Sequence, residues 1–113
     1  MQTILRNTAL LLAFCALFSC EYRAEYEFTV WDKETKRPID SVLVTIRLYS
    51  GGAERTAYRR TGYTNTMGIM EKSQMIGSGL STSRNEHKIS FEKVGYKTKT
   101  EENLLQGTIL LER

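Results

Sequence analysis

Hydrophobic and polar residues alternate with a period of two along much of the chain after residue 24. Tyr26, Phe28 and Val30 are separated by polar residues, which is typical of a strand with one buried face. A longer alternation over residues 42–49 places four aliphatic side chains on one face. The pattern therefore predicts two strands, joined through a polar turn at residues 32–40 that contains the only proline.

The second half of the chain predicts further short strands separated by turns. Residues 58–64 and 68–73 are expected to form a hairpin around Asn65-Thr66-Met67-Gly68, because Asn caps its own turn and Gly tolerates positive φ. Residues 76–85, rich in Gly and Ser, predict a loop. Ile89 with Phe91, and residues 108–112, predict later strands. No segment has convincing helical periodicity, so we expect an all-β sandwich.

The first twenty residues differ from the rest in hydropathy. A polar start that carries Arg6 precedes an apolar run over residues 9–18, and the small residue Ser19 follows. At 1.5 Å per residue the run covers about 15 Å, half of a bilayer core, which disfavours a stable transmembrane helix. A charged start, a short apolar run and a small residue are typical of a cleaved secretory signal.

The residues around Cys20 make that prediction more specific. Leu17-Phe18-Ser19-Cys20 resembles the bacterial lipobox, with Phe18 bulkier than is usual at its position. The resemblance implies removal of residues 1–19 by cleavage between Ser19 and Cys20, diacylglycerol on the Cys20 thiol, and an acyl chain such as palmitate on the new amine. Two or three chains, at ~0.8 kcal/mol per buried methylene, anchor a protein firmly. An ordinary cleaved signal or an uncleaved anchor would leave Cys20 unmodified.

Composition places the remaining residues among ordinary globular domains. The 113-residue chain is 41% hydrophobic and 26% charged, and its net charge of +3 comes from cations interspersed with anions, which does not call for a nucleic-acid partner. Cys15 lies in the predicted signal and Cys20 is the predicted lipid site, so no cysteine remains for a disulfide. We therefore expect a lipidated tether at residues 20–24 and one domain over residues 25–113, stabilised by its hydrophobic core.

Five short motifs follow one another through the expected domain. They are Phe28-Thr29-Val30-Trp31-Asp32, Lys36-Arg37-Pro38-Ile39, Val42-Leu43-Val44-Thr45-Ile46, Thr64-Asn65-Thr66-Met67-Gly68 and Val94-Gly95-Tyr96. Together they resemble the carboxypeptidase regulatory-like domains over about residues 25–112. The resemblance implies a small seven-stranded, prealbumin-like (transthyretin-type) Greek-key sandwich without chemistry of its own. The sequence departs from the family pattern at Phe28, Val42, Asn65 and Met70. All but Phe28 keep the role of the family residue, as a turn former or an apolar filler.

Residue types give little support to catalysis or metal binding. His87 is the only histidine, whereas a zinc site needs several nitrogen or sulfur ligands. A serine hydrolase needs a base beside its serine, and no nucleophile-elbow motif is present. We therefore expect no enzyme activity, no cofactor and no metal site, with His87 at the entrance of a strand.

A group of cations suggests a contact surface. Arg55, Arg59 and Arg60 lie close together beside Tyr58, with Arg47 expected on a neighbouring strand. Such a group can contact an anionic lipid, a glycan or an acidic protein. It can equally be a solvated edge that discourages strand pairing, which is the more usual role. In the first interpretation, residues 58–64 form an edge strand that accepts a strand from an acidic partner.

Two more residues carry surface hypotheses. Trp31, like Tyr49 and Tyr63, falls at a strand end or an outward position, where an aromatic ring can bind a glycan or cover a sheet face. Asp40-Ser41-Val42 resembles the acceptor triplet of a bacterial general O-glycosylation system, which would make Ser41 a modified surface residue.

These features predict a lipid-anchored structural or protein-binding module of the cell envelope, with the membrane and an envelope protein as its partners. We expect it at the outer membrane, facing the periplasm or the cell surface. The alternative is a glycan- or ligand-binding surface lipoprotein, in which Trp31 contacts the sugar.

Overall fold

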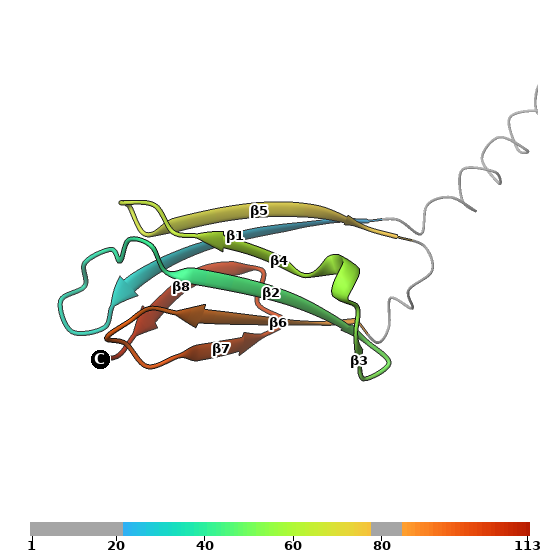
Figure 1. Ribbon diagram of the computed structural model, residues 1–113. Helices are drawn as coiled ribbons and strands as arrows, with labels where there is room; N and C mark the ends of the chain where they lie inside the picture. Colours follow the sequence, from blue (N-terminus) through green and yellow to red (C-terminus); the bar gives the residue numbers. More distant parts are fainter. Residues whose placement is uncertain (1–21, 78–84) are drawn as a thin grey trace, which may run out of the picture.

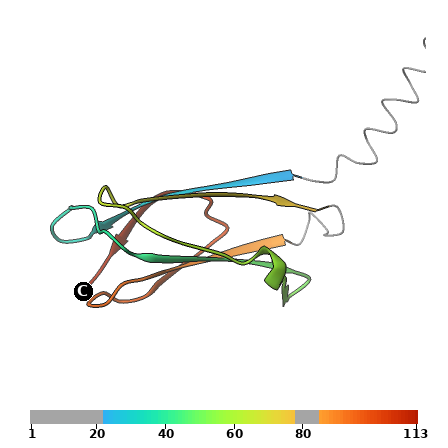
Figure 2. The same ribbon diagram turned by 45° about the horizontal axis from the view of Figure 1, so that its top comes forward.

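The computed structural model describes residues 22–77 and 85–113, which form two stacked β-sheets (Figure 1). The first sheet has three strands in the order β5-β1-β8, namely Ile69–Ile76, Tyr22–Asp32 and Gln106–Leu111. The second sheet has five: β3 (Ala53–Glu54), β2 (Leu43–Ser50), β6 (Asn85–Glu92) and β7 (Lys99–Glu102) in that order, with β4 (Arg60–Tyr63) also paired to β2. A 3-10 turn, η1 (Thr56–Tyr58), precedes β4. The two layers of the sandwich can be seen apart in Figure 2.

The all-β sandwich predicted from the alternation is confirmed, with eight strands in the described residues where seven were expected. The additional elements are short. β3 has two residues, and β7 reads Lys-Thr-Glu-Glu, which contains no apolar alternation. Both pair with one neighbouring strand, so backbone hydrogen bonding rather than side-chain burial holds them in the sheet.

Strand β1 follows the period-two pattern over its whole length. Its inward residues from Ala24 to Val30 are at most 2% exposed, whereas Glu25 and Glu27 between them point to solvent. The strand begins earlier than predicted: Tyr22 pairs with Ile76 of β5, so the end of the expected tether at residues 20–24 belongs to the sheet. The sequence analysis missed the first residues of the strand because charged residues occupy its outward face there.

The core lies between the two sheets. Phe28 of β1 and Phe91 of β6 meet edge to face near its centre, with ring centroids 5.2 Å apart and an angle of 84° between the rings. The buried hydrophobic residues are Ala24, Tyr26, Phe28, Val30, Ile39, Val42, Val44, Ile46, Leu48, Met70, Ile76, Ile89, Phe91, Ile109 and Leu111. All of these residues lie between Ala24 and Leu111, so the core of the described structure is contained in residues 21–113.

The predicted hairpin between residues 58–64 and 68–73 is wrong in its pairing and right in its turn. The Asn65 side chain accepts the N–H groups of Met67 and Ile69, and Gly68 has a φ of +76°. Beyond this turn the strands separate: β4 pairs with β2 in one sheet and β5 pairs with β1 in the other. The turn therefore joins the two layers of the sandwich at one end.

Several sequence predictions concern residues outside the described part of the chain. These are the signal segment at residues 1–19, the cleavage site between Ser19 and Cys20, and most of the loop at residues 76–85. In the part that the structure describes, no helix has the length and hydropathy needed to cross a bilayer.

Candidate functional site

The arginine group predicted as a contact surface lies at one edge of the five-stranded sheet. β4 pairs with β2 on one side, which leaves its other side as the sheet edge that the sequence predicted. Arg59 and Arg47 both contact Glu54 of β3, the latter at 3.3 Å between Nε and Oε1. Glu54 therefore balances part of the positive charge at this edge.

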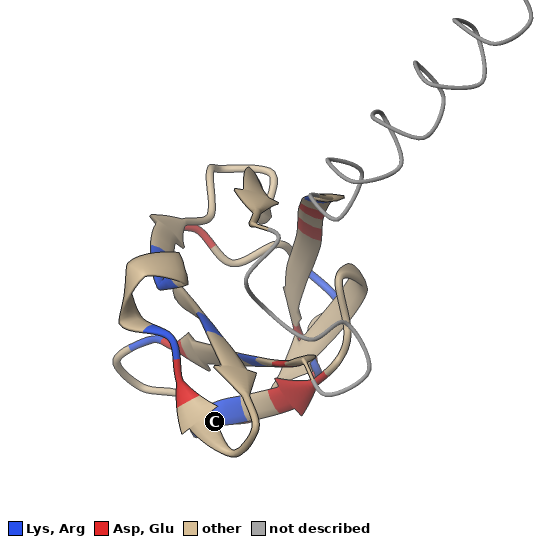
Figure 3. Ribbon diagram, turned by 90° about the vertical axis from the view of Figure 1, so that its right-hand side faces the viewer, with Lys and Arg blue, Asp and Glu red and all other residues tan. Residues whose placement is uncertain are grey.

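The remaining members of the group have different surroundings. The Arg60 guanidinium donates to the backbone carbonyls of Ala57 and Arg59, each at 2.9 Å, so it holds the turn that precedes β4. The Arg55 side chain is exposed. The structure thus brings the predicted residues together, and only part of the group offers charge to a partner. Seen along the sandwich, cations and anions both occur around the sheets (Figure 3).

Tyr58 belongs to the interior more than to the surface. Its hydroxyl accepts the Gly77 N–H at 3.1 Å, and its carbonyl accepts a hydrogen bond from the Gln74 side chain at 3.0 Å. Gln74 Nε2 also donates to the Tyr26 hydroxyl at 3.1 Å. These hydrogen bonds connect Tyr58, at the end of η1, with β5 and with Gly77 after it. Through Gln74 they also reach β1. Burial raises the pKa of Tyr26, which keeps this hydroxyl neutral.

His87 lies two residues inside β6, so the expectation of a strand entrance is close to its position. Its side chain is buried and packs edge-on against Tyr26, with ring centroids 5.7 Å apart. Burial lowers the pKa of His87, and its Nε2 atom has no hydrogen-bond partner. Across residues 22–77 and 85–113, no three His, Cys, Asp or Glu side chains are grouped closely enough to hold a metal ion.

A polar cluster that the sequence did not predict lies at the other end of β1. The buried Asp32 carboxylate accepts the N–H groups of Glu34 and Thr35 through Oδ1 and the Tyr96 hydroxyl through Oδ2, the last at 2.7 Å. Arg113 Nε donates to the same Oδ2 at 3.2 Å, and the guanidinium lies over the Tyr96 ring. The Tyr96 hydrogen bond, followed by the backbone donors, lowers the pKa of Asp32 to about 2.

This cluster ties together three distant parts of the chain. Asp32 ends β1, Tyr96 lies in the turn between β6 and β7, and Arg113 follows β8. The sequence analysis identified Asp32 as part of a turn and Tyr96 as part of a motif, but sequence spacing gives no sign that they meet. All of these groups donate hydrogen bonds to the Asp32 carboxylate and hold the three segments together, and we call this cluster the turn clamp. It is not the arrangement of a nucleophile with its base.

Trp31 and Ser41, the two residues with surface hypotheses, are both exposed. Trp31 is 36% exposed and shares the outward face of β1 with Thr29 and Glu27. Ser41 is exposed, with a φ of 59°, and its hydroxyl donates to Asp40 at 3.1 Å. It borders a hollow of about 310 Å³ whose other lining residues include Tyr63, which is 66% exposed, and Val94, which is 97% exposed.

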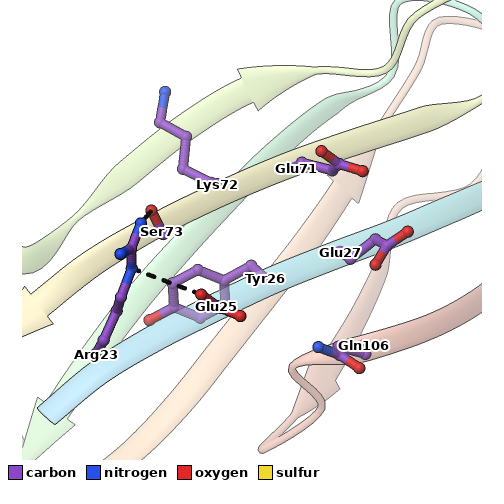
Figure 4. A pocket seen from close by; sticks show the side chains of 8 residues that line it. All are labelled: Arg23, Glu25, Tyr26, Glu27, Glu71, Lys72, Ser73 and Gln106. Atoms are coloured by element: carbon purple, nitrogen blue, oxygen red, sulfur yellow. Dashed lines mark hydrogen bonds and ion pairs between the residues drawn. The ribbon is translucent and has the colours of Figure 1, made fainter.

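A larger hollow of about 530 Å³ lies along β1 and β5 of the three-stranded sheet (Figure 4). Arg23 bridges Glu25, at 3.6 Å, and Ser73, at 3.2 Å, while Glu27, Glu71 and Lys72 complete its charged lining. The hollow is shallow and its lining carries charges of both signs, so it resembles a solvated sheet face more than an enclosed ligand site. Trp31 lies outside this lining.

Comparison with known proteins gives information on the fold alone. No family model and no curated protein matches the chain. Among solved structures, the 3-chlorocatechol 1,2-dioxygenase of Rhodococcus opacus is similar with a TM-score of 0.52 and 14% identity, over 71% of this chain. The chain spans 42% of that dioxygenase chain.

The C-terminal domain of the shaft pilin SpaA from Lactobacillus rhamnosus is similar with a TM-score of 0.52 and 12% identity, over 80% of this chain and 98% of that domain. At such identities the likeness concerns the backbone alone, and an enzyme and a structural pilin share it. The chain is thus an all-β sandwich of a type found in both.

Proposed function

We propose that this protein is a lipid-anchored structural or protein-binding module of the cell envelope, without catalysis of its own. The motifs between Phe28 and Tyr96 support placing its sandwich among the carboxypeptidase regulatory-like domains. An outer-membrane location, facing the periplasm or the cell surface, agrees with the lipobox-like residues at Leu17 to Cys20.

The observation that carries the proposal is the short distance in sequence between Cys20 and the fold. β1 begins at Tyr22, so one residue, Glu21, separates the proposed lipid site from a strand paired with β5. A lipid on Cys20 would hold the Tyr22 end of the sandwich directly at the bilayer surface. Two or three acyl chains suffice for stable anchoring, and no linker would then let the domain move far from the membrane.

The proposed contact with an envelope protein uses the edge formed by β3, η1 and β4. An edge strand presents unpaired N–H and C=O groups to a partner strand. Arg55 and Arg59 are both exposed at this edge, but Arg59 is engaged with Glu54, and Arg60 is engaged with backbone carbonyls. An acidic partner strand would therefore gain most from Arg55, with Tyr58, Arg59 and Arg60 beneath and beside it.

The anchor is tested by expressing the full chain in a bacterium and analysing the mature N-terminus by mass spectrometry. We expect a chain that begins at an acylated Cys20 and remains in the membrane fraction. Cys20→Ser should release it, whereas Cys15→Ser, within the proposed signal, should leave the mature protein unchanged. A mature chain that begins elsewhere, or an unmodified Cys20, would contradict the proposal.

The protein contact is tested by affinity capture from gently solubilised membranes. Arg55→Glu should reduce recovery of a partner at least tenfold, while Arg37→Glu, an exposed cation in the turn after β1, should not. Equal loss with both variants would point to general charge effects, and undiminished capture with Arg55→Glu would exclude this edge. A sugar affinity that Trp31→Ala abolishes would instead favour a glycan-binding lipoprotein.

A further inference from the structure

Among the strands that the structure describes, three of the four open sheet edges carry a charged residue on their inward side. The register shows this directly: Lys72 of β5 lies opposite the buried Tyr26, Arg60 of β4 opposite Ile46, and Glu101 of β7 opposite Ile89. An inward-pointing charge at an edge disfavours pairing with a strand that brings no opposite charge, because the added strand would bury it. These three edges are therefore protected against pairing with a copy of themselves, and the β4 edge remains open to an acidic strand.

The edge strand β8 has no inward charge of its own, although Lys99 and the Lys97 N–H, which donates to the Glu112 carbonyl at 2.7 Å, cover its C-terminal end. The strand reads Gln-Gly-Thr-Ile-Leu-Leu and contains no charged residue. Its inward positions, Ile109 and Leu111, lie opposite Val30 and Asp32 of β1 and are at most 2% exposed. β8 pairs with β1 on one side only, and it is the end strand of the three-stranded sheet.

The hydrogen-bonding direction along β8 follows from its contacts with β1. The carbonyls of Leu105 and Leu111 accept the N–H groups of Glu27 and Lys33, each at 3.0 Å, so the odd-numbered residues face β1. Because N–H and C=O groups alternate in direction along a strand, those of Gln106, Thr108 and Leu110 face the open side. Lys99 Nζ lies 3.4 Å from the Leu110 carbonyl and covers one end of this row.

The outward side chains beside this edge are uncharged as well. Gln106 and Thr108 are exposed, and Leu110 is half-buried. Leu110 lies opposite Trp31 in the register of β8 with β1, and Thr108 lies opposite Thr29. Backbone donors and acceptors, apolar surface and an absence of like charges thus coincide along one strand.

We propose that β8 pairs antiparallel with β8 of a second copy of this chain, around a two-fold axis at Thr108. Antiparallel pairing of two identical strands is self-complementary, and this register places Thr108 opposite its own copy and Gln106 opposite Leu110. No like charges meet, whereas self-pairing of any other edge would cover an inward charge. The inference does not depend on the lipid anchor, because residues 21–113 contain the whole of β8 and the core beneath it.

The pairing covers a short edge, so association is expected to be weak in solution. The interface is well below the standard size of ~1,600 Å² for stable complexes, so self-association has to be measured at high protein concentration. Antiparallel pairing also directs the two Tyr22 ends away from each other. A dimer anchored through both copies of Cys20 would therefore lie with its strands along the membrane surface.

Cysteine cross-linking of residues 21–113, which contain no native cysteine, tests the pairing directly. Residues in a hydrogen-bonded antiparallel pair have Cα atoms ~5.5 Å apart, within the range of a disulfide. Thr108→Cys should therefore form a disulfide-linked dimer at 0.5 mM protein under mild oxidation. Thr100→Cys is the matched control, because Thr100 is an exposed threonine on β7, the edge strand of the other sheet. Equal cross-linking of the two variants would overturn the proposal.

Charge at position 108 gives a second, independent test by sedimentation velocity. Thr108→Lys and Thr108→Glu should each be at least tenfold weaker in self-association than the parent segment, because like charges then lie opposite each other. An equimolar mixture of the two variants should restore association, since Lys then lies opposite Glu. Melting curves at low concentration check that both variants fold. A parent segment that stays monomeric at 1 mM, or a mixture that stays dissociated, would refute pairing through Thr108.

Discussion

Gly68 lies where three segments of the chain meet, and replacing it with alanine tests the turn that joins the two sheets. Its carbonyl accepts the Val30 N–H at 2.8 Å, and the Val30 carbonyl in turn accepts the Ile39 N–H at 2.9 Å. A Cβ at Gly68 would lie 2.6 Å from the Val30 oxygen and 3.1 Å from Pro38 Cβ. The Val30 oxygen belongs to the central strand of its sheet, so it cannot turn aside as a flexible side chain does.

Two costs add up for Gly68→Ala. An alanine at a φ of +76° costs about 1–2 kcal/mol from backbone sterics alone. Relieving the contact moves Gly68 away from Val30 and weakens the hydrogen bonds that both residues make, which costs a further ~1–3 kcal/mol. The sum, about 2–5 kcal/mol, is a large part of the ~5–14 kcal/mol expected for a domain of this size.

Gly51→Ala separates the two costs. Gly51 has a similar φ of +62°, but a Cβ there would meet no atom within 4 Å. We therefore expect Gly51→Ala to cost only the ~1–2 kcal/mol of the backbone conformation. The assay is urea unfolding of residues 21–113 followed by circular dichroism, with equal m-values required for the comparison. If the two variants lose the same stability within ~0.5 kcal/mol, the close contact of Gly68 with β1 is refuted.

Three further experiments test the core, the turn clamp and the arginine edge. Phe28→Ala should destabilise the domain by ~3–5 kcal/mol in the same urea assay, whereas Glu27→Ala beside it should change stability by no more than ~0.5 kcal/mol, and similar losses would contradict the assigned core face. The pKa of Asp32 is lowered from 3.8 to about 2, chiefly by the Tyr96 hydroxyl, so its stabilising contribution is complete above pH 4 and is lost as pH falls toward 2. Asp32→Asn should therefore flatten the loss of melting temperature between pH 4 and pH 2, and an unchanged slope would argue against the clamp. A double-mutant cycle of Glu54→Ala with Arg59→Ala should give a coupling of ~0.2–1 kcal/mol that vanishes in ~1 M salt, and zero coupling at low salt would show that the two charges do not pair in solution.

The sequence by itself determined which side chains of the long strands face the core. Alternation identified Tyr26, Phe28 and Val30 of β1 and the inward row of β2 from Val44 to Leu48, all of which are buried. This worked because a strand has a fixed period of two, so a run of alternating residues specifies one buried face wherever its partners lie. The local turn at Asn65 to Gly68 was likewise predictable, since its hydrogen bonds and positive φ involve neighbouring residues.

Tertiary structure decided which strands pair and which distant groups meet. β4 and β5 adjoin the same turn yet lie in different sheets: β4 pairs with β2, and β5 pairs with β1 and buries Met70, Gln74 and Ile76. The same applies to the surface: local sequence grouped the arginines, but only the fold placed Glu54 between Arg47 and Arg59. The Asp32 clamp and the uncharged edge of β8 depend on contacts across as many as 81 residues of sequence, for which residue spacing carries no signal.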